Sequence, residues 1–431
     1  MTITVNIDDS TYQITDSSNE CDKNKYFLKT NQNQKYLEDA KSKNPKDILD
    51  ASTCIELLQI NKKIKIIGIT GTNGKTTTAA AIYSILLDLG KKVGFQGTRG
   101  CFINEKRVAD KSLTTPPILQ TIQNLYMALQ DGCEYFVMEV SSHAIEQKRI
   151  EGLNFALKIL TNISQDHLDY HGTIENYIAI KSSFFDDNCL KLINKDENKI
   201  RFNKTNCMTY SLEKPATYKV AAYSLKDGIS VAVQNIDKVF DFSSPMHGLF
   251  NIYNLLAAIS GVDMLKVAPI QEICEVVDNF GGVEGRMEVV SENPLVIVDF
   301  AHTPDGMEKV LDSLKDKNII VVFGAGGDRD RTKRPLMARV ANRYAKKLVI
   351  TSDNPRSEEP KEIIKDILSG LKTDNGILVE EDREKAIKKA LQIRENDEII
   401  LILGKGDETY QEIKGQKIPF DDRKVVKKLL S

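Results

Sequence analysis

The chain has 431 residues and carries 59 Lys and Arg against 61 Asp and Glu, so its formal net charge is −2. This length allows two or three domains with full hydrophobic cores, which need no disulfide or metal staple, and the balanced charge argues against a general nucleic-acid-binding protein. We expect a cytoplasmic protein with reduced thiols and no structural zinc site. No apolar run could span a bilayer, no signal peptide opens the chain, and its seven Cys and five His are scattered.

Three units are predicted along the chain. Residues 1–62 are polar and rich in Asn, Lys and Asp, with short strand-like pieces such as TITVNI and KYFL. Residues 63–281 alternate strands with helices, and GGVEGR (281–286) is typical of a connection between domains. In residues 282–431 the runs PLVIVDF, NIIVVFG, KLVIT and EIILILG are separated by helical segments. This alternation predicts a second, smaller parallel α/β unit.

A glycine-rich loop opens the second unit. GITGTNGKTTT (68–78) ends an apolar run that suits a strand buried on both faces, and residues 76–89 read as a helix. Free N–H groups and the helix dipole favour an anion at such a junction. Lys75 would neutralise the β- and γ-phosphates of a nucleotide, and the Thr76 hydroxyl would ligate Mg²⁺. Ile69 occupies the place of the first Gly of the usual P-loop, so an ordinary tight turn is the alternative. The order of strand, glycines, Lys, Thr and helix favours a variant P-loop.

Polar side chains follow the next two predicted strands, YFVMEV (135–140) and ALKILTN (156–162). In open α/β sheets, ligands bind beyond such strand ends. Glu139 and His167 are therefore candidate ligands or neighbours of a Mg²⁺ ion at the γ-phosphate, with Thr76 completing the site. A capped turn is the alternative for either cluster alone, but two clusters beside one P-loop favour a functional site.

The strands of the third unit end in turns rich in Gly, Asp and Arg. GGDRDRTKRP holds Arg329 and Arg334, DNPRSEEP holds Arg356, and LGKGDETY holds Glu408. Turns and helix caps explain the Gly and Asp residues, but not three Arg at one sheet edge. Arg and acidic groups together suit a zwitterionic small molecule. Arg binds a carboxylate through two parallel hydrogen bonds, and Asp or Glu pairs with an ammonium group. A flexible joint between this unit and the P-loop unit would allow closure over both substrates.

Together these motifs resemble the Mur ligases of peptidoglycan synthesis, whose loop reads GTNGKT[ST] and is matched by residues 71–77. The resemblance covers the second and third units almost throughout. Its further motifs are LTTP (113–116), MEVSSH (138–143), TNISQDHLDYHG (161–172), GLFNIYNLLAA (248–258), EGRME (284–288), DFAHTPD (299–305), GGDRDRTKRP (326–335), DNPRSEEP (353–360) and LGKGDETYQ (403–411). It implies a three-domain α/β fold with a small N-terminal UDP-binding domain (1–62), a central ATP-binding P-loop domain (63–281) and a C-terminal Rossmann-like, amino-acid-binding domain (282–431).

Within the family the motifs are most similar to those of the tripeptide synthetases, and DNPR (353–356) resembles the type that adds meso-diaminopimelate. The resemblance implies amide bond formation on UDP-MurNAc-L-Ala-D-Glu through an acyl phosphate, with ATP and Mg²⁺ as cofactors. It also implies a monomer without nucleic-acid partners or membrane insertion. A lysine-adding enzyme, a folylpolyglutamate-synthase-like ligase and a nucleotide-binding module without turnover are the alternatives. The pocket for the distal carboxylate discriminates between diaminopimelate addition and the first two alternatives, because only diaminopimelate offers a second carboxylate together with a second amine.

The resemblance assigns roles residue by residue. The catalytic residues are Lys75, Glu139, His167 and Lys181, where Lys181 matches the lysine that is carbamylated in the family, and the metal ligands are Thr76, Glu139, His167 and the Lys181 carbamate. The ATP contacts are Gly71, Thr72, Asn73, Gly74, Lys75, Thr76, Thr77, Asn251, Arg286 and Asp299. The contacts to the UDP-sugar peptide are Ser17, Thr114, Thr115, Ser141 and Arg149. The amino-acid contacts are Arg334, Asp353, Asn354, Arg356, Gly404 and Glu408.

Three positions depart from the family's pattern. Phe300 stands where the family usually has Tyr, so a hydroxyl contact is lost there. Asp407 replaces a common His in the motif GKGHE. TDSS (15–18) lacks the Arg of the family's DSR, which leaves Ser17 as the predicted contact on the uridine side.

Overall fold

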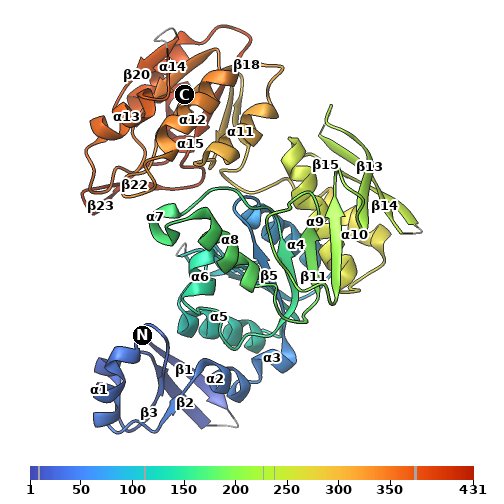
Figure 1. Cartoon of the computed structure of the whole chain (residues 1–431), viewed down its shortest axis with the longest axis vertical. Coiled ribbons are helices and arrows are strands. Elements are labelled where there is room, and N and C mark those ends of the chain that lie inside the picture. Colours follow the sequence, from blue (N-terminus) through green and yellow to red (C-terminus); the bar gives the residue numbers. More distant parts are fainter. Residues whose placement is uncertain (8–9, 111–112, 227, 237, 373–375) are drawn as a thin grey trace.

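The computed structural model of the chain describes residues 1–7, 10–110, 113–226, 228–236, 238–372 and 376–431. Three lobes follow one another along the longest axis, with the N-terminal lobe at one end and the C-terminal lobe at the other (Figure 1). They are built on a four-stranded, an eleven-stranded and a six-stranded sheet joined by helices. The predicted three-lobed α/β fold is confirmed, and we propose residues 1–62, 63–281 and 282–431 as its domains.

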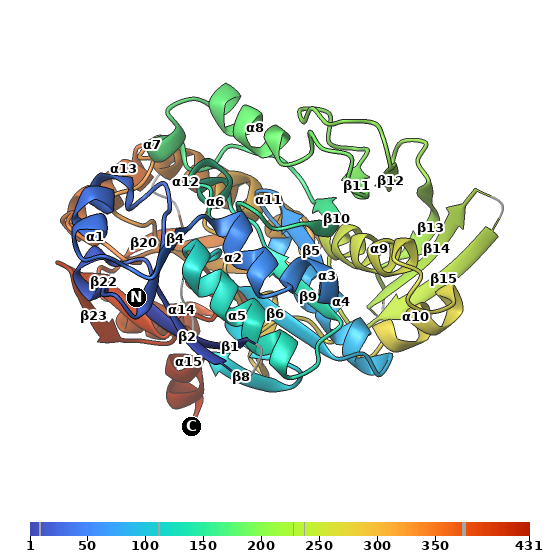
Figure 2. The same ribbon diagram turned by 90° about the horizontal axis from the view of Figure 1, so that it is seen from below.

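The N-terminal lobe shares its hydrophobic core with the central lobe. Its elements are β1 (Thr2–Ile7), β2 (Ser10–Thr15), η1 (Ser18–Glu20), β3 (Lys25–Leu28), η2 (Gln34–Tyr36), α1 (Leu37–Ser42), β4 (Asp47–Leu49), α2 (Ala51–Leu57) and α3 (Ile60–Lys63). Ile3, Val5 and Ile14 belong to one core cluster with residues of the central lobe. Helices α2 and α3 pack against α5 (Ile118–Gln130) of that lobe, as Figure 2 shows.

The central sheet places the strand before the glycine-rich loop in its middle. Its strands are β5 (Lys65–Thr70), β6 (Val93–Gly97), β7 (Gly100–Ile103), β8 (Lys106–Ala109), β9 (Tyr135–Glu139), β10 (Phe155–Leu160), β11 (Lys191–Asn194), β12 (Cys207–Ser211), β13 (Tyr218–Ser224), β14 (Ile229–Asn235) and β15 (Lys238–Ser244). β5 lies between β9 and β10 and runs parallel to both. Its Ile66, Ile67 and Ile69 are fully buried, as expected for a strand covered on both faces.

Helices cover both faces of this sheet. α4 (Lys75–Asp88), α9 (Leu249–Met264) and α10 (Ile270–Val277) share one core, and α5 contributes to the core on the other face. Three further helices follow β9 and β10, namely α6 (Ser142–Glu146), α7 (Leu168–His171) and α8 (Ile174–Ser183). The predicted helix after the glycine-rich loop is α4, which begins one residue after Gly74.

Strands β13, β14 and β15 form an antiparallel extension that our sequence analysis does not predict. They continue the sheet beyond β12 and project from the side of the molecule (Figure 1). Burial alternates along β14, where Val231 and Val233 are buried and Ser230 and Gln234 are exposed. This alternation is typical of an antiparallel sheet with one solvated face.

The C-terminal lobe is a second, mostly parallel sheet. Its strands are β16 (Glu288–Glu292), β17 (Leu295–Asp299), β18 (Asn318–Phe323), β19 (Lys347–Ile350), β20 (Ile377–Val379) and β21 (Glu398–Leu403), in the order β16-β17-β21-β18-β19-β20. Its helices are α11 (Pro304–Asp312), α12 (Lys333–Tyr344), α13 (Pro360–Leu368), α14 (Arg383–Ile393) and α15 (Asp422–Leu430), and β22 (Tyr410–Ile413) and β23 (Gln416–Pro419) form a hairpin. Only β16 is antiparallel, so the carboxyl ends of the other strands meet at one edge.

The seven cysteines are all free thiols, and Cys54 and Cys101 are among the buried ones. Burial raises the pKa of both thiols to about 12, so they stay protonated and unreactive at neutral pH. No helix in the described part of the chain has the length and apolar character needed to cross a bilayer.

Gly68 of β5 has no room for a side chain. A Cβ atom there would lie 2.6 Å from Phe155 Cε1 and 2.9 Å from Phe184 Cζ. We expect Gly68→Ala to lower the free energy of unfolding by about 1–3 kcal/mol, because the aromatic rings must shift to accept the methyl group. Urea denaturation measures this. Gly281→Ala is the control, since a Cβ there meets nothing within 4 Å. Because the steric conflict is with the ring, Gly68→Ala combined with Phe155→Leu should cost less than the sum of both single changes, and simple additivity would contradict this.

Candidate active site

The glycines of the P-loop are required by close packing. A Cβ on Gly71 would lie 1.9 Å from Thr161 Oγ1, and one on Gly74 would lie 2.3 Å from Asn254 Oδ1. Gly74 also has a φ of +83°, a left-handed conformation that favours glycine. The loop thus lies against β10 and α9 with its backbone close to both, and α4 begins directly behind it.

Two lysine ammonium groups meet at one backbone carbonyl of this loop. Lys75 Nζ donates to Gly71 O at 2.8 Å and to Thr72 O at 2.9 Å. Lys181 Nζ, from α8, donates to Gly71 O at 2.9 Å and to Thr70 Oγ1 at 3.1 Å. Burial lowers the pKa of Lys75. Burial and then the Lys75 charge hold the pKa of Lys181 well below its ordinary value.

Glu139 and Thr76 form the oxygen-rich part of the predicted metal site. Thr76 Oγ1 donates to Glu139 Oε2 at 2.9 Å, and Thr98 N donates to Glu139 Oε1 at 2.8 Å. Within the described ranges, no three side chains of His, Cys, Asp or Glu converge as a metal cage. Mg²⁺ commonly binds through one or two carboxylates plus substrate phosphates, so this oxygen pair beside a phosphate loop fits that ion.

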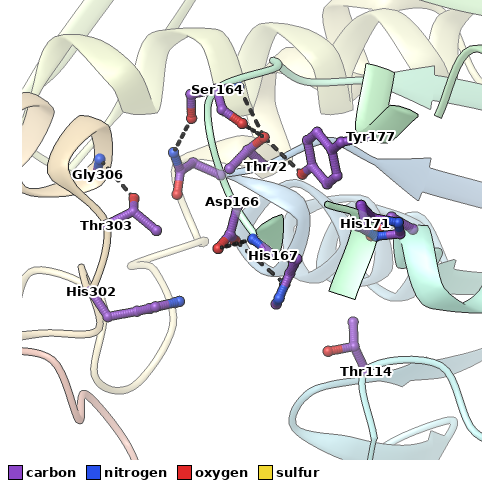
Figure 3. Close-up of polar contacts among 12 residues, drawn as sticks. Thr72, Thr114, Ser164, Asp166, His167, His171, Tyr177, His302, Thr303 and Gly306 are labelled. Atoms are coloured by element: carbon purple, nitrogen blue, oxygen red, sulfur yellow. Dashed lines mark hydrogen bonds and ion pairs between the residues drawn. The ribbon is translucent and has the colours of Figure 1, made fainter. Parts of the chain in front are cut away.

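His167 lies in a ring cluster next to the site. Its ring centroid is 4.9 Å from that of His143, and its Nε2 is 3.4 Å from Asp166 Oδ2 (Figure 3). Burial lowers the pKa of His167 to about 3, which keeps the imidazole neutral, the form that ligates metals. The structure therefore brings Thr76 and Glu139 into direct contact, and His167 into contact with Asp166 and His143.

A cavity of about 330 Å³ lies between the central and C-terminal lobes, and we call it the interlobe cavity. Its lining includes predicted ATP contacts from both lobes: Asn73, Gly74, Thr77, Asn251, Arg286 and Asp299. Asp299 accepts hydrogen bonds from the backbone N–H groups of Ala301 and Met287, at 2.7 and 2.8 Å. Burial raises the pKa of Asp299. The cavity has the place and the lining expected for a nucleotide behind the P-loop.

Contacts between the two lobes were not predicted from the sequence. Asp305, at the start of α11, accepts from Asn73 Nδ2 at 2.7 Å, from Ser164 Oγ at 3.0 Å and from Lys309 Nζ at 2.9 Å. In Figure 3, Ser164 lies beside Thr72 of the P-loop, and the Thr303 hydroxyl accepts from Gly306 N within the C-terminal lobe. Since Asn73 belongs to the P-loop, the C-terminal lobe contacts that loop directly.

A buried ion pair forms a second link between these lobes. Lys333 Nζ of α12 donates to Asp166 Oδ1 at 2.5 Å, and both side chains are less than 10% exposed. Burial alone would raise the pKa of Asp166, but the nearby His167 and Lys333 lower it below its ordinary value.

The residues predicted to hold the UDP-sugar peptide are brought together, apart from Ser17. Ser141 N donates to Thr115 Oγ1 at 3.0 Å, and Arg149 Nη1 donates to Thr115 O at 2.8 Å. Thr114 Oγ1 is 3.3 Å from Thr98 Oγ1, the residue that also holds Glu139. These groups therefore lie on the Glu139 side of the P-loop.

A second, smaller cavity lies where the N-terminal lobe meets this group. Arg149 and Gln147 line it from the central lobe, and Asp16 lines it from the loop that carries the adjacent Ser17. Gln147 was missed by the sequence analysis; its Oε1 accepts from Arg149 Nη2 at 2.6 Å. The available signal was its place two residues before Arg149 in AIEQKR.

The loops at the edge of the C-terminal sheet form one polar cluster. Asn354 Nδ2 donates to Glu408 Oε2 at 2.8 Å, and Lys405 Nζ donates to the same oxygen at 2.9 Å. A Cβ on Gly404 would lie 2.4 Å from Asp353 Oδ2. The predicted residues Asp353, Asn354, Gly404 and Glu408 thus share one site, and at its centre lies the buried Lys405, to which the sequence analysis assigns no role.

The three arginines of this edge have different environments. Arg356, in a left-handed conformation with φ 51°, donates from Nη1 to Gly327 O at 2.6 Å and places Nε 3.3 Å from Glu412 Oε2. Arg334 is 1% exposed, and its guanidinium donates to Glu358 and Asp366. Arg329 is exposed and lies beside Arg356 across Gly326. Arg334 thus already has carboxylate partners within the lobe, and the Arg329 guanidinium donates to Asp328 O.

Family models match most of the chain. The Mur ligase middle domain matches residues 69–262, and the domain described as Mur ligase, glutamate ligase domain matches residues 285–406. The chain is 54% identical over 413 residues to the UDP-N-acetylmuramoyl-L-alanyl-D-glutamate--2,6-diaminopimelate ligase of Wolinella succinogenes, with 96% of this chain and 95% of that protein covered. It is 51% identical over 409 residues to the protein of the same name from Helicobacter pylori, covering 93% and 91%.

Solved structures give the same picture. A UDP-N-acetylmuramoyl-L-alanyl-D-glutamate--2,6-diaminopimelate ligase aligns with a TM-score of 0.68 and 29% identity, covering 100% of this chain and 99% of that one. Folylpolyglutamate synthase of Mycobacterium tuberculosis, complexed with ADP and AMPPCP, has a TM-score of 0.68 at 17% identity, covering 82% and 91%. At that identity the second likeness shows a common fold alone.

The ion pair between Asp166 and Lys333 can be tested by a double-mutant cycle. We expect Lys333→Met to destabilise the folded chain by about 3–5 kcal/mol, because Asp166 is then left buried without its partner. The double variant with Asp166→Asn should lose less than Lys333→Met alone, since no charge is stranded. Thermal unfolding of the four proteins measures the coupling. Additive losses would contradict an interaction between the two side chains.

Proposed function

The chain belongs to the Mur ligase family, and we propose that it adds meso-diaminopimelate to UDP-MurNAc-L-Ala-D-Glu in peptidoglycan synthesis. It is an ATP-dependent, ADP-forming ligase that makes a carbon–nitrogen bond between the D-Glu side-chain carboxylate and an amine of diaminopimelate. We propose that it works in the cytoplasm as a monomer, with no nucleic-acid partner. A lysine-adding enzyme and a folylpolyglutamate-synthase-like ligase are the candidates that this assignment replaces.

One observation carries the proposal: the likeness to named diaminopimelate ligases extends over both lobes of the site. The aligned region contains the P-loop and Lys181 on the central lobe, and the DNPR and GKGDE loops on the C-terminal lobe. A protein that only bound nucleotides would not require the DNPR and GKGDE loops of the C-terminal lobe. The folylpolyglutamate synthase structure has the same fold, but its identity to this chain is far lower.

The first step is attack of the D-Glu γ-carboxylate oxygen on the γ-phosphorus of ATP, which releases ADP and leaves an acyl phosphate. Lys75 and the loop N–H groups stabilise the charge that develops on the phosphoryl oxygens. Thr115, Ser141 and Arg149 hold the UDP-sugar peptide so that its carboxylate reaches the P-loop. Positioning of this kind contributes ~7–11 kcal/mol to lowering a barrier.

The second step is attack of the diaminopimelate amine on the acyl carbon, and phosphate leaves from the tetrahedral intermediate. The carboxylates of Asp353 and Glu408 and the amide of Asn354 suit the ammonium groups of the amino acid. The guanidinium of Arg356 suits one of its carboxylates. Mg²⁺ held by Thr76, Glu139, His167 and the Lys181 carbamate would supply positive charge to the phosphate oxygens. The interlobe cavity holds the nucleotide between Asn251 and Asp299.

We predict that Lys181 is carbamylated. A neutral amine adds to CO₂ and loses a proton, which converts a cation into an anion suited to a metal. Lys181→Ala should therefore be nearly inactive, and short-chain carboxylates at high concentration should restore part of its activity. Lys75→Ala is the matched control, because it loses a cation and should be inactive without any rescue. Phosphate release measures both, and equal rescue of the two variants would contradict the carbamate.

Strong preference for meso-diaminopimelate over lysine is expected, carried mainly by Arg356. Within the described residues its contacts engage Nη1 and Nε, so Nη2 remains for the distal carboxylate. With lysine, the guanidinium would face an ammonium instead. A site built for a buried polar group rejects an analogue that lacks it by roughly 10⁴–10⁵.

Phosphate release with both amino acids, on the wild type and Arg356→Ala, decides this. The ratio of kcat/KM for diaminopimelate over lysine should fall sharply in Arg356→Ala and stay unchanged in the control Arg343→Ala, an exposed arginine on α12. Comparable use of lysine by the wild type would overturn the substrate. An unchanged ratio in Arg356→Ala would overturn the role of that residue alone.

A further inference from the structure

The joint between the central and C-terminal lobes is the connection of residues 281–286. It lies directly against the loop of residues 404–408, which carries Glu408. A Cβ on Gly285 would lie 2.1 Å from Asp407 N and 2.4 Å from the carbonyl carbon of Gly406. Gly285 also has a φ of +68°. Both observations require glycine at this position, and they show that the backbone of the joint and the backbone of residues 404–408 are in contact.

Phe300 completes this junction from the end of β17. A Cβ on Gly406 would lie 2.7 Å from both Phe300 Cβ and Gly285 O, so three backbone segments meet at one point. Gly404 N donates to Asp299 O at 3.1 Å, which ties the same loop to the residue before Phe300. The loop and the strand end are therefore held as one piece.

The other side of the junction faces the interlobe cavity. The guanidinium carbon of Arg286 lies 4.3 Å from the centre of the Phe300 ring, a cation–π contact. Arg286 and Asp299 both line the interlobe cavity. Adjacent residues thus face different sites: Gly285 touches the 404–408 loop, and Arg286 lines the cavity.

The end of this loop that carries Glu408 belongs to the polar cluster at the edge of the C-terminal sheet. Lys405 is fully buried, and its Nζ donates to Asn354 Oδ1 at 3.2 Å as well as to Glu408. A displacement of residues 404–408 would therefore move Glu408 and Asn354 together. The contacts form a continuous chain from Arg286 through Phe300 and Gly406 to Glu408.

We infer that Phe300 and Gly285 are positioning residues that couple the nucleotide in the interlobe cavity to the amino acid at the 404–408 loop. Phe300 holds Arg286 through its ring and contacts Gly406 through its backbone and Cβ, and it needs no hydroxyl for either contact. The inference rests on the proposed function, because it takes ATP and diaminopimelate as the two ligands. These tightly packed segments have few alternative positions. A displacement of Arg286 at the cavity would therefore displace residues 404–408 as well.

Steady-state kinetics of four variants test the coupling. Gly285→Ala and Phe300→Leu should each raise KM for both ATP and diaminopimelate, for Phe300→Leu by roughly 3- to 30-fold, the range expected for loss of a cation–π contact. KM for the UDP-sugar dipeptide should stay unchanged, because its predicted contacts are on the other lobes. Phe300→Tyr keeps the ring and should behave as the wild type. Phe240→Leu, which removes a buried ring from β15, is the matched packing control.

Calorimetry measures the coupling itself. Titration of diaminopimelate into the wild type with and without a non-hydrolysable ATP analogue should give Kd values that differ within the usual range of about 5- to 150-fold. The ratio should approach one in Phe300→Leu and return in Phe300→Tyr. A wild-type ratio of one, an unchanged ratio in Phe300→Leu, or a rise in KM for one substrate only would overturn the inference. A wild type that does not turn over diaminopimelate would overturn the proposed function instead.

Discussion

The rest of the site depends on two lysine side chains, the buried Lys181 and the half-buried Lys75, that donate to one carbonyl oxygen. Lys75 and Lys181 both donate to Gly71 O, and the two groups are close enough for the Lys75 charge to lower the pKa of Lys181. Such an arrangement is costly unless anions surround it. Glu139 and Asp166 provide part of that negative charge, and a polyphosphate would provide the rest. The site is thus built for a highly charged ligand.

The same electrostatic need explains why the site is divided between lobes. Asp166 lies on the central lobe, but its ion-pair partner Lys333 belongs to the C-terminal lobe. Asp305 belongs to the C-terminal lobe and accepts from Asn73 of the P-loop. Each lobe brings charges that the other one satisfies. The charges of the site are therefore paired only when the two lobes lie together as in this structure.

The local sequence pattern was sufficient to predict the strand, the loop and the helix of the P-loop region. The strand β5, the loop and α4 appear where the apolar run, the glycines and the Lys-Thr pair predict them. Contacts between residues far apart in the sequence could not be predicted in this way. Asp305 looks like a helix-capping acid within HTPD, and Arg334 looks like one of several free arginines, until the fold places Glu358 and Asp366 beside it. The antiparallel β13–β15 extension was missed although its alternating pattern was available.

The core shared by the first two lobes has a consequence for synthesis on the ribosome. Ile3, Val5 and Ile14 lie in one core cluster with residues of α5, and β1 packs against that helix. The first strand is therefore synthesised before the helix of the central lobe that packs on it. At 5–20 residues per second, the ~70 residues between the end of the first lobe and the end of α5 take roughly 3–14 s to make. During that interval the face of β1 that packs on α5 in the folded chain has no such helix to cover it.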